Sequence, residues 1–120
     1  MANPIYHNFP GCSDIVNRSL EDYLMRGYEP GSFLTAVLAN DLFGAVGRAD
    51  GYNKQNLNYI VQAISISMPI GSYGSYDHVH DWVGDKHGCR SRYVDFMEKE
   101  RMMDILSGKH DPKIKVFIKG

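Results

Sequence analysis

Imidazole, thiol and carboxylate side chains crowd into one short stretch of this sequence, Asp77–Cys89. These are groups that bind zinc in proteins. On a helix, however, His78 and His80 lie about 200° apart and cannot share a metal ion, whereas Asp77 and Asp81 are four residues apart and share a face. The spacing fits no standard zinc motif. We therefore predict no metal site and interpret the stretch as a polar helix face followed by a turn.

A second candidate group is a carboxylate inside an apolar run. The run Gly31–Arg48 predicts a helix that is apolar nearly all round, and such a helix is expected to be buried at the centre of a fold. Asp41 falls within the apolar arc, and Arg48 follows seven residues later on the same stripe. A buried carboxylate must be paired, hydrogen-bonded or protonated. We predict that Asp41 is buried and paired, either with Arg48 or with backbone N–H groups at a neighbouring helix start.

The third candidate is the uncharged loop Pro69–Tyr76, which is rich in glycine, serine and tyrosine. Its end coincides with a predicted helix start, and a helix N-terminus attracts anions. Tyrosine rings can stack on a base. The predicted ligand-binding residues are therefore Arg48, Ser72, Tyr73, Ser75 and Tyr76. The alternative is that the segment is a plain connecting loop.

Helices are expected to position these groups, because apolar residues recur at helical spacing along most of the chain. Five are predicted, with their caps and stops: Ser13 to Gly27, Gly31 to about Ala49, Asp50 to Pro69, Ser75 to Val83, and Ser91 to Gly108. Asn40, Asp41 and Asp50 are interpreted as structural polar residues, with Asp50 capping the third helix.

The two ends of the chain have different patterns. Residues 1–12 carry two prolines and a glycine and predict an extended arm, followed by a single helical domain over residues 13–108. Residues 109–120 predict a strand-like tail in which Ile114, Val116 and Ile118 recur with period two and share a face. A strand needs a partner. We expect the tail to join subunits of a homo-oligomer or to dock onto a partner protein, and pairing with Ile5–Phe9 of the same chain is the alternative.

Composition sets limits on the class of protein. The chain has 120 residues, 43% of them hydrophobic and 22% charged, which suits one globular domain. A net charge of −1 argues against binding to duplex nucleic acid. Two cysteines allow one disulfide at most, and the first residues do not resemble a secretory signal. No run is long and apolar enough to span a membrane, so we expect a cytoplasmic protein.

The segment from Tyr23 to Trp82 resembles a family of small proteins encoded by bacteriophages and prophages, a family without an assigned activity. The matching positions are Gly27, Pro30, Gly31, Phe33, Leu34, Ala36, Val37, Leu38, Asn40, Asp41, Leu42, Arg48, Ala49, Asp50, Asn53, Pro69, Gly74, Ser75 and Trp82. About half the chain is covered, and residues from about Gly84 onward match nothing in the family pattern. The resemblance implies a phage source and action in the host cytoplasm.

These observations predict a mainly α fold: a compact bundle of four to five short helices around a buried central helix, with a C-terminal strand-like tail. The expected function is non-enzymatic binding, in host takeover or counter-defence. The expected partner is a host protein or a small anionic, nucleotide-like ligand, and no cofactor or catalytic residue is assigned. One alternative is a small enzyme, with or without zinc, that uses Asp41, Arg48 and the Asp77–Cys89 cluster. Another is a structural or assembly component of the virion.

Overall fold

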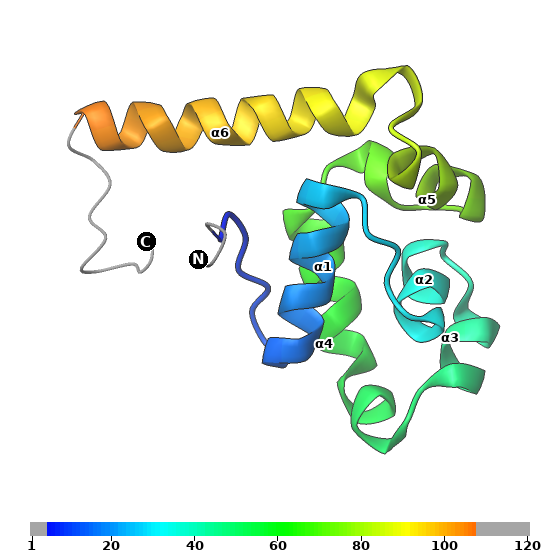
Figure 1. Cartoon of the computed structure of the whole chain (residues 1–120). Coiled ribbons are helices and arrows are strands. Elements are labelled where there is room, and N and C mark those ends of the chain that lie inside the picture. The colour runs from blue at the N-terminus through cyan, green and yellow to red at the C-terminus, as the bar shows by residue number, and fades with distance from the viewer. Residues whose placement is uncertain (1–4, 108–120) are drawn as a thin grey trace.

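The computed structural model describes residues 5–107, and within that range the chain forms six α-helices and two short 3₁₀ turns (Figure 1). They are α1 (Asp14–Arg26), α2 (Ser32–Leu38), α3 (Leu42–Arg48), α4 (Gly51–Ser67), η1 (Ile70–Ser72), α5 (Tyr76–Val83), η2 (Lys86–Gly88) and α6 (Cys89–Ser107). The predicted mainly α fold is confirmed, with six helices in place of four to five. The predicted tail, residues 109–120, lies outside the described residues.

Local capping explains where α1, α4 and α5 begin. The side chains of Ser13, Asp50 and Ser75 each accept a hydrogen bond from the backbone N–H three residues further on, as expected for N-caps. At the other end of α1, Gly27 has a φ of 70° and donates its N–H to the Tyr23 carbonyl. A left-handed residue at this position ends a helix, and glycine adopts it without strain.

The predicted continuous helix over Gly31–Arg48 is wrong, because the chain turns at Asn40. Asn40 has a φ of 62°, and its N–H donates to the Val37 carbonyl at 3.1 Å. The next N–H, that of Asp41, donates to the Ala36 carbonyl at 2.9 Å. This pair of bonds is a Schellman motif, which closes α2. Two short helices therefore replace the buried central one, and α3 buries only Ala45.

The core lies among α1, α2, α4 and α5, and α1 contributes more buried residues than any other helix of the described residues. The largest fully buried side chains are Phe9, Leu20, Tyr23, Leu24, Leu38, Ile60 and Ser72. The Trp82 indole N–H on α5 donates to the Tyr23 carbonyl at 3.1 Å, and the Tyr23 hydroxyl donates to the Ser72 carbonyl at 2.6 Å. These bonds join α5 and the η1 turn to α1, so the polar ends of two large core rings are satisfied.

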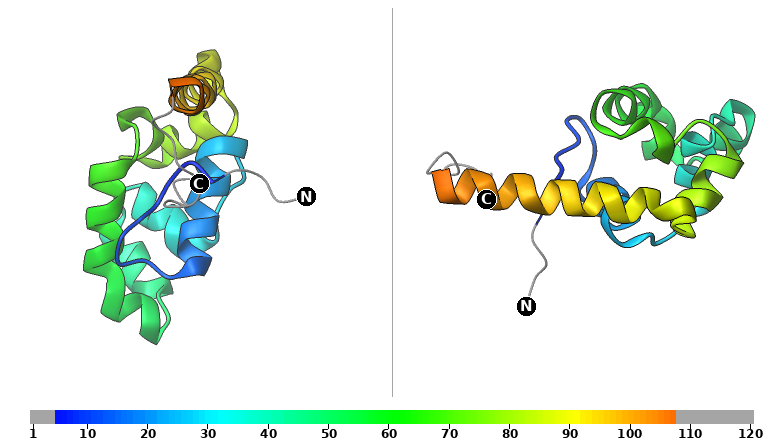
Figure 2. Two further views of the ribbon diagram at one scale, coloured as in Figure 1. Left: turned by 90° about the vertical axis from the view of Figure 1, so that its left-hand side faces the viewer. Right: turned by 90° about the horizontal axis from the view of Figure 1, so that it is seen from above.

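The last helix, α6, differs from the others because it contains no buried residue. Tyr93, Val94 and Met97 in its first half pack against the core. Its second half extends past the rest of the body, as two views show (Figures 1 and 2). No helix within residues 5–107 combines the length and apolarity needed to cross a membrane.

Candidate functional site

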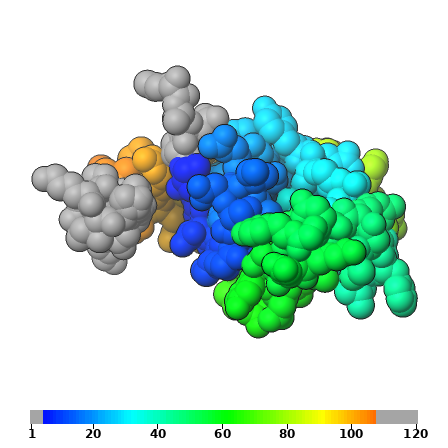
Figure 3. All heavy atoms as spheres, turned by 90° about the horizontal axis from the view of Figure 1, so that it is seen from below, coloured from blue at the N-terminus to red at the C-terminus, as the bar shows by residue number. Residues whose placement is uncertain are grey.

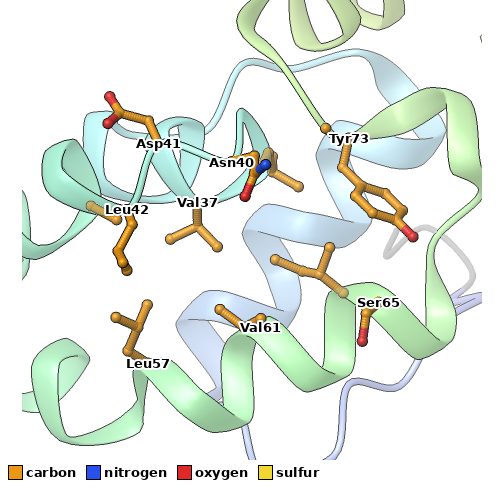
Figure 4. Close-up of a pocket in the computed structure, with 12 residues that line it drawn as sticks. Val37, Asn40, Asp41, Leu42, Leu57, Val61, Ser65 and Tyr73 are labelled. Carbon is orange, nitrogen blue, oxygen red and sulfur yellow. The ribbon is translucent and has the colours of Figure 1, made fainter.

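A groove with a volume of about 390 Å³ lies between α4 on one side and α2–α3 on the other (Figure 4). Its lining residues are Val37, Leu38, Asn40, Asp41, Leu42, Ala45, Leu57, Val61, Ile64, Ser65, Tyr73 and Gly74. The volume is in the range of sites that hold small molecules or peptide side chains. Seen from below, α4 covers a broad part of the surface beside α3 (Figure 3). We define these twelve residues as the groove.

The two walls of the groove are apolar and remain partly open to solvent. Val37 and Leu42 point from α2–α3 toward Leu57 and Val61 on α4 (Figure 4). Leu42 is 62% exposed and Val61 is 45% exposed. Leu57 and Val61 belong to the amphipathic stripe of α4, whose other members Ile60 and Ile64 are buried. The stripe is therefore wider than the core needs, and its outer edge forms one wall.

Asp41 marks one edge of the groove, with its carboxylate directed away from the apolar walls (Figure 4). It accepts the Tyr76 hydroxyl at 2.6 Å and the Gly44 N–H at 2.9 Å, the second bond capping α3. The Tyr76 bond, the Gly44 bond and the charge of Arg48 together lower the pKa of Asp41. A side chain at Gly44 would collide with both Asp41 and Arg48. The carboxylate is therefore ionised and held at a helix start.

The expectation that Asp41 is buried is wrong, since its side chain is only partly covered. The expected pairing with N–H groups at a neighbouring helix start is correct, because α3 begins directly after this residue. The expectation that Asp41 is buried depends on one continuous helix over Gly31–Arg48. Once the chain turns at Asn40, the carboxylate moves out of the apolar arc and satisfies the new helix end instead.

The predicted ligand-binding residues do not form one cluster. Tyr73 lines the groove, and Tyr76 bonds to Asp41 at its edge, where the charge of Arg48 also acts. Ser72, in contrast, is fully buried, and its hydroxyl donates to the Pro69 carbonyl at 2.6 Å. The Ser75 hydroxyl oxygen accepts the N–H at the start of α5. The two serines are thus engaged in local structure, while the tyrosines and the arginine face the groove edge.

The Asp77–Cys89 stretch spreads its polar groups around a helix and a turn. The His80 side chain is 91% exposed, and its Nδ1 atom lies 3.9 Å from an Asp81 carboxylate oxygen. His78 Nδ1 lies 3.0 Å from the Ser75 hydroxyl. Asp85 accepts both the N–H and the hydroxyl of Ser91, and these bonds lower its pKa. Across residues 5–107, no three His, Cys, Asp or Glu side chains come together as a metal site would require.

A cluster that sequence reasoning missed connects the N-terminal arm to two helices. Glu21 on α1 is 2% exposed and accepts the N–H groups of Tyr6 and His7, each at 3.0 Å. The His7 ring places Nδ1 2.7 Å from Glu21 and Nε2 2.5 Å from the Tyr93 hydroxyl on α6. The ring lies nearly parallel to the Phe9 and Tyr93 rings, with centroid distances of 5.9 and 5.8 Å. The arm and α1 therefore meet at the Glu21 carboxylate, and α6 joins them through the other nitrogen of the His7 ring.

The direction of each hydrogen bond in this cluster follows from which groups can donate. A carboxylate only accepts, so Nδ1 of His7 carries hydrogen, and Nε2 of a neutral ring then accepts the Tyr93 hydroxyl. Burial raises the pKa of Tyr93 to about 12, with the Glu21 charge adding to the shift. The His7 and Glu21 side chains are only 5% and 3% exposed. The cluster is enclosed and fully hydrogen-bonded, so it holds the arm in place and is not the site we assign to binding.

Comparison of the chain with protein-family models, curated proteins and solved structures found no match.

Proposed function

We propose that this chain is a non-enzymatic binding protein that holds an apolar helical segment of another protein in the groove. The supporting observation is apolar surface that residues 5–107 leave uncovered. On α3, next to the groove, Leu42 is 62% exposed, Phe43 is 91% exposed and Val46 is 43% exposed. Contiguous exposed apolar surface of this kind marks interaction sites in soluble proteins.

The shape of the groove favours a helix as its occupant. Its two walls are themselves helical, α2–α3 and α4 (Figure 4). An amphipathic helix can place residues spaced three or four apart into such a groove. Because Phe43 and Val46 extend the apolar surface beyond the groove, a protein segment covers more of it than a small molecule would.

The charge at the groove edge argues against a small anionic ligand. Asp41 lines the groove, and its lowered pKa keeps it ionised at neutral pH. Arg48 provides opposite charge nearby, but that charge already acts on Asp41. An anion here would meet a fixed carboxylate without a surplus of positive charge. We therefore favour the protein partner over the nucleotide-like ligand.

The resemblance to phage-encoded proteins supplies the biological setting of the proposal. A phage protein that acts by binding would take a protein of its bacterial host as partner. We propose host takeover or counter-defence as the role, with the groove as the contact surface.

The test is photo-cross-linking of the full chain in bacterial cells. A photoreactive residue replaces Val61 in the groove or, as the matched control, Ile66, which is 82% exposed on the same helix and does not line the groove. We expect a discrete cross-linked protein from position 61 alone. The substitution Leu42→Glu should reduce its yield about tenfold, which corresponds to about 1.4 kcal/mol of binding free energy.

Two results would contradict the proposal. One is the same set of products from positions 61 and 66, which would indicate random collision. The other is an unchanged yield in Leu42→Glu, because a charge in the wall must disrupt an apolar contact. Circular dichroism of each variant checks that the helices are intact.

A further inference from the structure

The exposed apolar residues of α3 lie in one arc that begins at the groove. Leu42 points toward the opposite wall of the groove (Figure 4). At about 100° per residue, Val46 lies about 40° and Phe43 about 100° further round the helix, and Gly47 follows at about 140°. At 91%, Phe43 is the most exposed large apolar side chain of residues 5–107. We call Leu42, Phe43, Val46 and Gly47 the α3 arc.

The two charges at the ends of α3 lie on its other side. A Cβ at Gly44 would collide with the side chains of Asp41 and Arg48, so both charges stand over Gly44. Gly44 lies about 200° from Leu42, outside the arc. The arc itself has no charged residue, and the whole chain has a net charge of only −1. A second copy of the chain can therefore approach the arc without strong repulsion.

The arc and the groove together make this surface self-complementary. A two-fold dimer pairs one surface patch with the same patch of a second copy, so the patch must hold both a projection and a recess. Here the α3 arc is the projection, and the groove beside it is the recess. Phe43 and Val46 are three residues apart, which is a spacing that helices use to fill apolar grooves. The helix α3 thus has the properties that the groove requires of its occupant.

The area of such a contact is that of a reversible dimer. An aromatic side chain buries about 150–250 Å² when it is covered, and nearly all of the Phe43 ring is available. The groove walls that receive the ring lose a similar area, and both contacts occur twice in the dimer. With Leu42 and Val46 added, the total comes to about 1,000 Å², the lower limit for a specific interface. A partner that covers more surface can displace a contact of this size.

We propose that a second copy of this chain occupies the groove until the host protein displaces it. The inference rests on the proposed function, because both occupants use the same groove. Phe43 and Val46 of each copy enter the groove of the other, and the dimer covers apolar surface that would otherwise promote non-specific association. Self-association therefore regulates the groove, since the host segment must compete with α3 for it.

Light scattering of the purified full chain tests the dimer. We expect the wild type to form dimers and Phe43→Glu to weaken their association about tenfold or more, because the substitution places a charge in an apolar groove. The matched control is Ile66→Glu, since Ile66 is 82% exposed on α4 and does not line the groove. This control should dimerise as the wild type does. Circular dichroism checks that the helices of both variants are intact.

Photo-cross-linking of the purified chain locates the contact. A photoreactive residue at position 61, in the absence of host protein, should give a product of twice the chain mass. Mass spectrometry of a digest should join position 61 to the peptide that contains Phe43. Adding bacterial lysate should lower the yield of this dimer product and raise that of the host product, because the two occupants compete for one groove.

Three results would overturn the inference: a wild type that stays monomeric, dimers that persist in Phe43→Glu, and a dimer product that lysate leaves unchanged while the host product forms. Loss of dimers in Ile66→Glu as well would assign self-association to another part of the surface. The host product in cells decides the proposed function separately. A monomeric wild type that still yields the host product would therefore remove this inference alone.

Discussion

Glu21 and Asp41 both tie a distant part of the chain to a helix, but they do so in opposite surroundings. Glu21 is 2% exposed and is held by two backbone N–H groups and a histidine ring. Asp41 is partly exposed and is held by one hydroxyl and one backbone N–H. The carboxylate with more donors is the one that the fold can bury, because ionised groups leave water only when their hydrogen bonds are replaced.

The comparison also separates their roles. The bonds of Glu21 fix the N-terminal arm against α1 and α6, so Glu21 should matter for stability. The bonds of Asp41 set the start of α3 and one edge of the groove, so Asp41 should matter for binding geometry and less for stability.

The largest expected effect is that of Glu21→Ala. The substitution leaves the N–H groups of Tyr6 and His7 and the His7 ring without their acceptor. We expect a loss of about 3 kcal/mol in the free energy of unfolding, measured by urea denaturation. The neighbouring change Asp22→Ala is the matched control. It removes a partly exposed ion pair with Arg26 and should lower stability by about 0.5 kcal/mol.

Equal losses in Glu21→Ala and Asp22→Ala would contradict the distinction between a buried and a surface carboxylate. Such a result would mean that the arm separates from α1 readily and that water replaces the lost bonds.

A smaller effect is expected at the turn that places Asp41. Asn40 has a φ of 62°, which is strained for a side chain other than asparagine, aspartate or glycine. Asn40→Ala should lower the free energy of unfolding by about 1 kcal/mol, whereas Asn40→Gly should be close to neutral. Asn58→Ala, an exposed helical position on α4, controls for loss of the amide. A loss in Asn40→Gly as large as that in Asn40→Ala would assign the role to the side chain and not to the backbone angle.

The smallest expected effect on stability is that of Tyr76→Phe, and its clearest readout is a titration. Loss of the hydroxyl should raise the pKa of Asp41 toward its ordinary value, because the Tyr76 bond is the largest cause of the lowering. Nuclear magnetic resonance of the carboxyl carbon would measure the shift. Tyr52→Phe, at an exposed tyrosine on α4, should leave the Asp41 titration unchanged.

The same change predicts a dependence of stability on pH with a definite sign. A lowered pKa in the folded state stabilises the fold above the unfolded pKa of about 3.9. That contribution disappears as pH falls through the lowered folded pKa. The wild type should therefore be more stable than Tyr76→Phe at neutral pH, and the two should converge in acid. A difference that is constant across this range would show that the hydroxyl acts by packing and not by its bond to Asp41.

Local signals in the sequence were sufficient for most helix boundaries. Ser13, Asp50 and Ser75 were recognised as N-caps, and Gly27 and Pro69 as stops, because each acts on the backbone within a few residues. The turn at Asn40 also has a local signal, since asparagine can close one helix and aspartate can cap the next. The apolar residues on both sides of Asn40 continue the helical spacing, so the pattern predicts one unbroken helix. Spacing of apolar residues does not show where a single backbone φ angle changes.

The buried cluster and the groove could not be predicted in the same way. Glu21 is buried because the arm and α6 reach it, and the His7–Tyr93 contact joins residues 86 positions apart. On α4, Ile60 is buried and Val61 is exposed, and this division depends on where α2–α3 stop. Both features follow from the placement of helices relative to one another, which helical periodicity does not specify.

The long span of the His7–Tyr93 contact has a consequence for synthesis of the protein. A ribosome adds about 5–20 residues per second and releases the N-terminal arm first. Glu21 can engage the arm early, since the two are 14 residues apart, but Tyr93 follows on the order of ten seconds later. A nascent chain that stops before α6 would hold its arm by α1 alone, because the Tyr93 hydroxyl that contacts the His7 ring is missing. Such a product opens more easily at the arm, and transiently open states are the ones that proteases degrade, so the His7–Tyr93 contact protects a chain once α6 has folded.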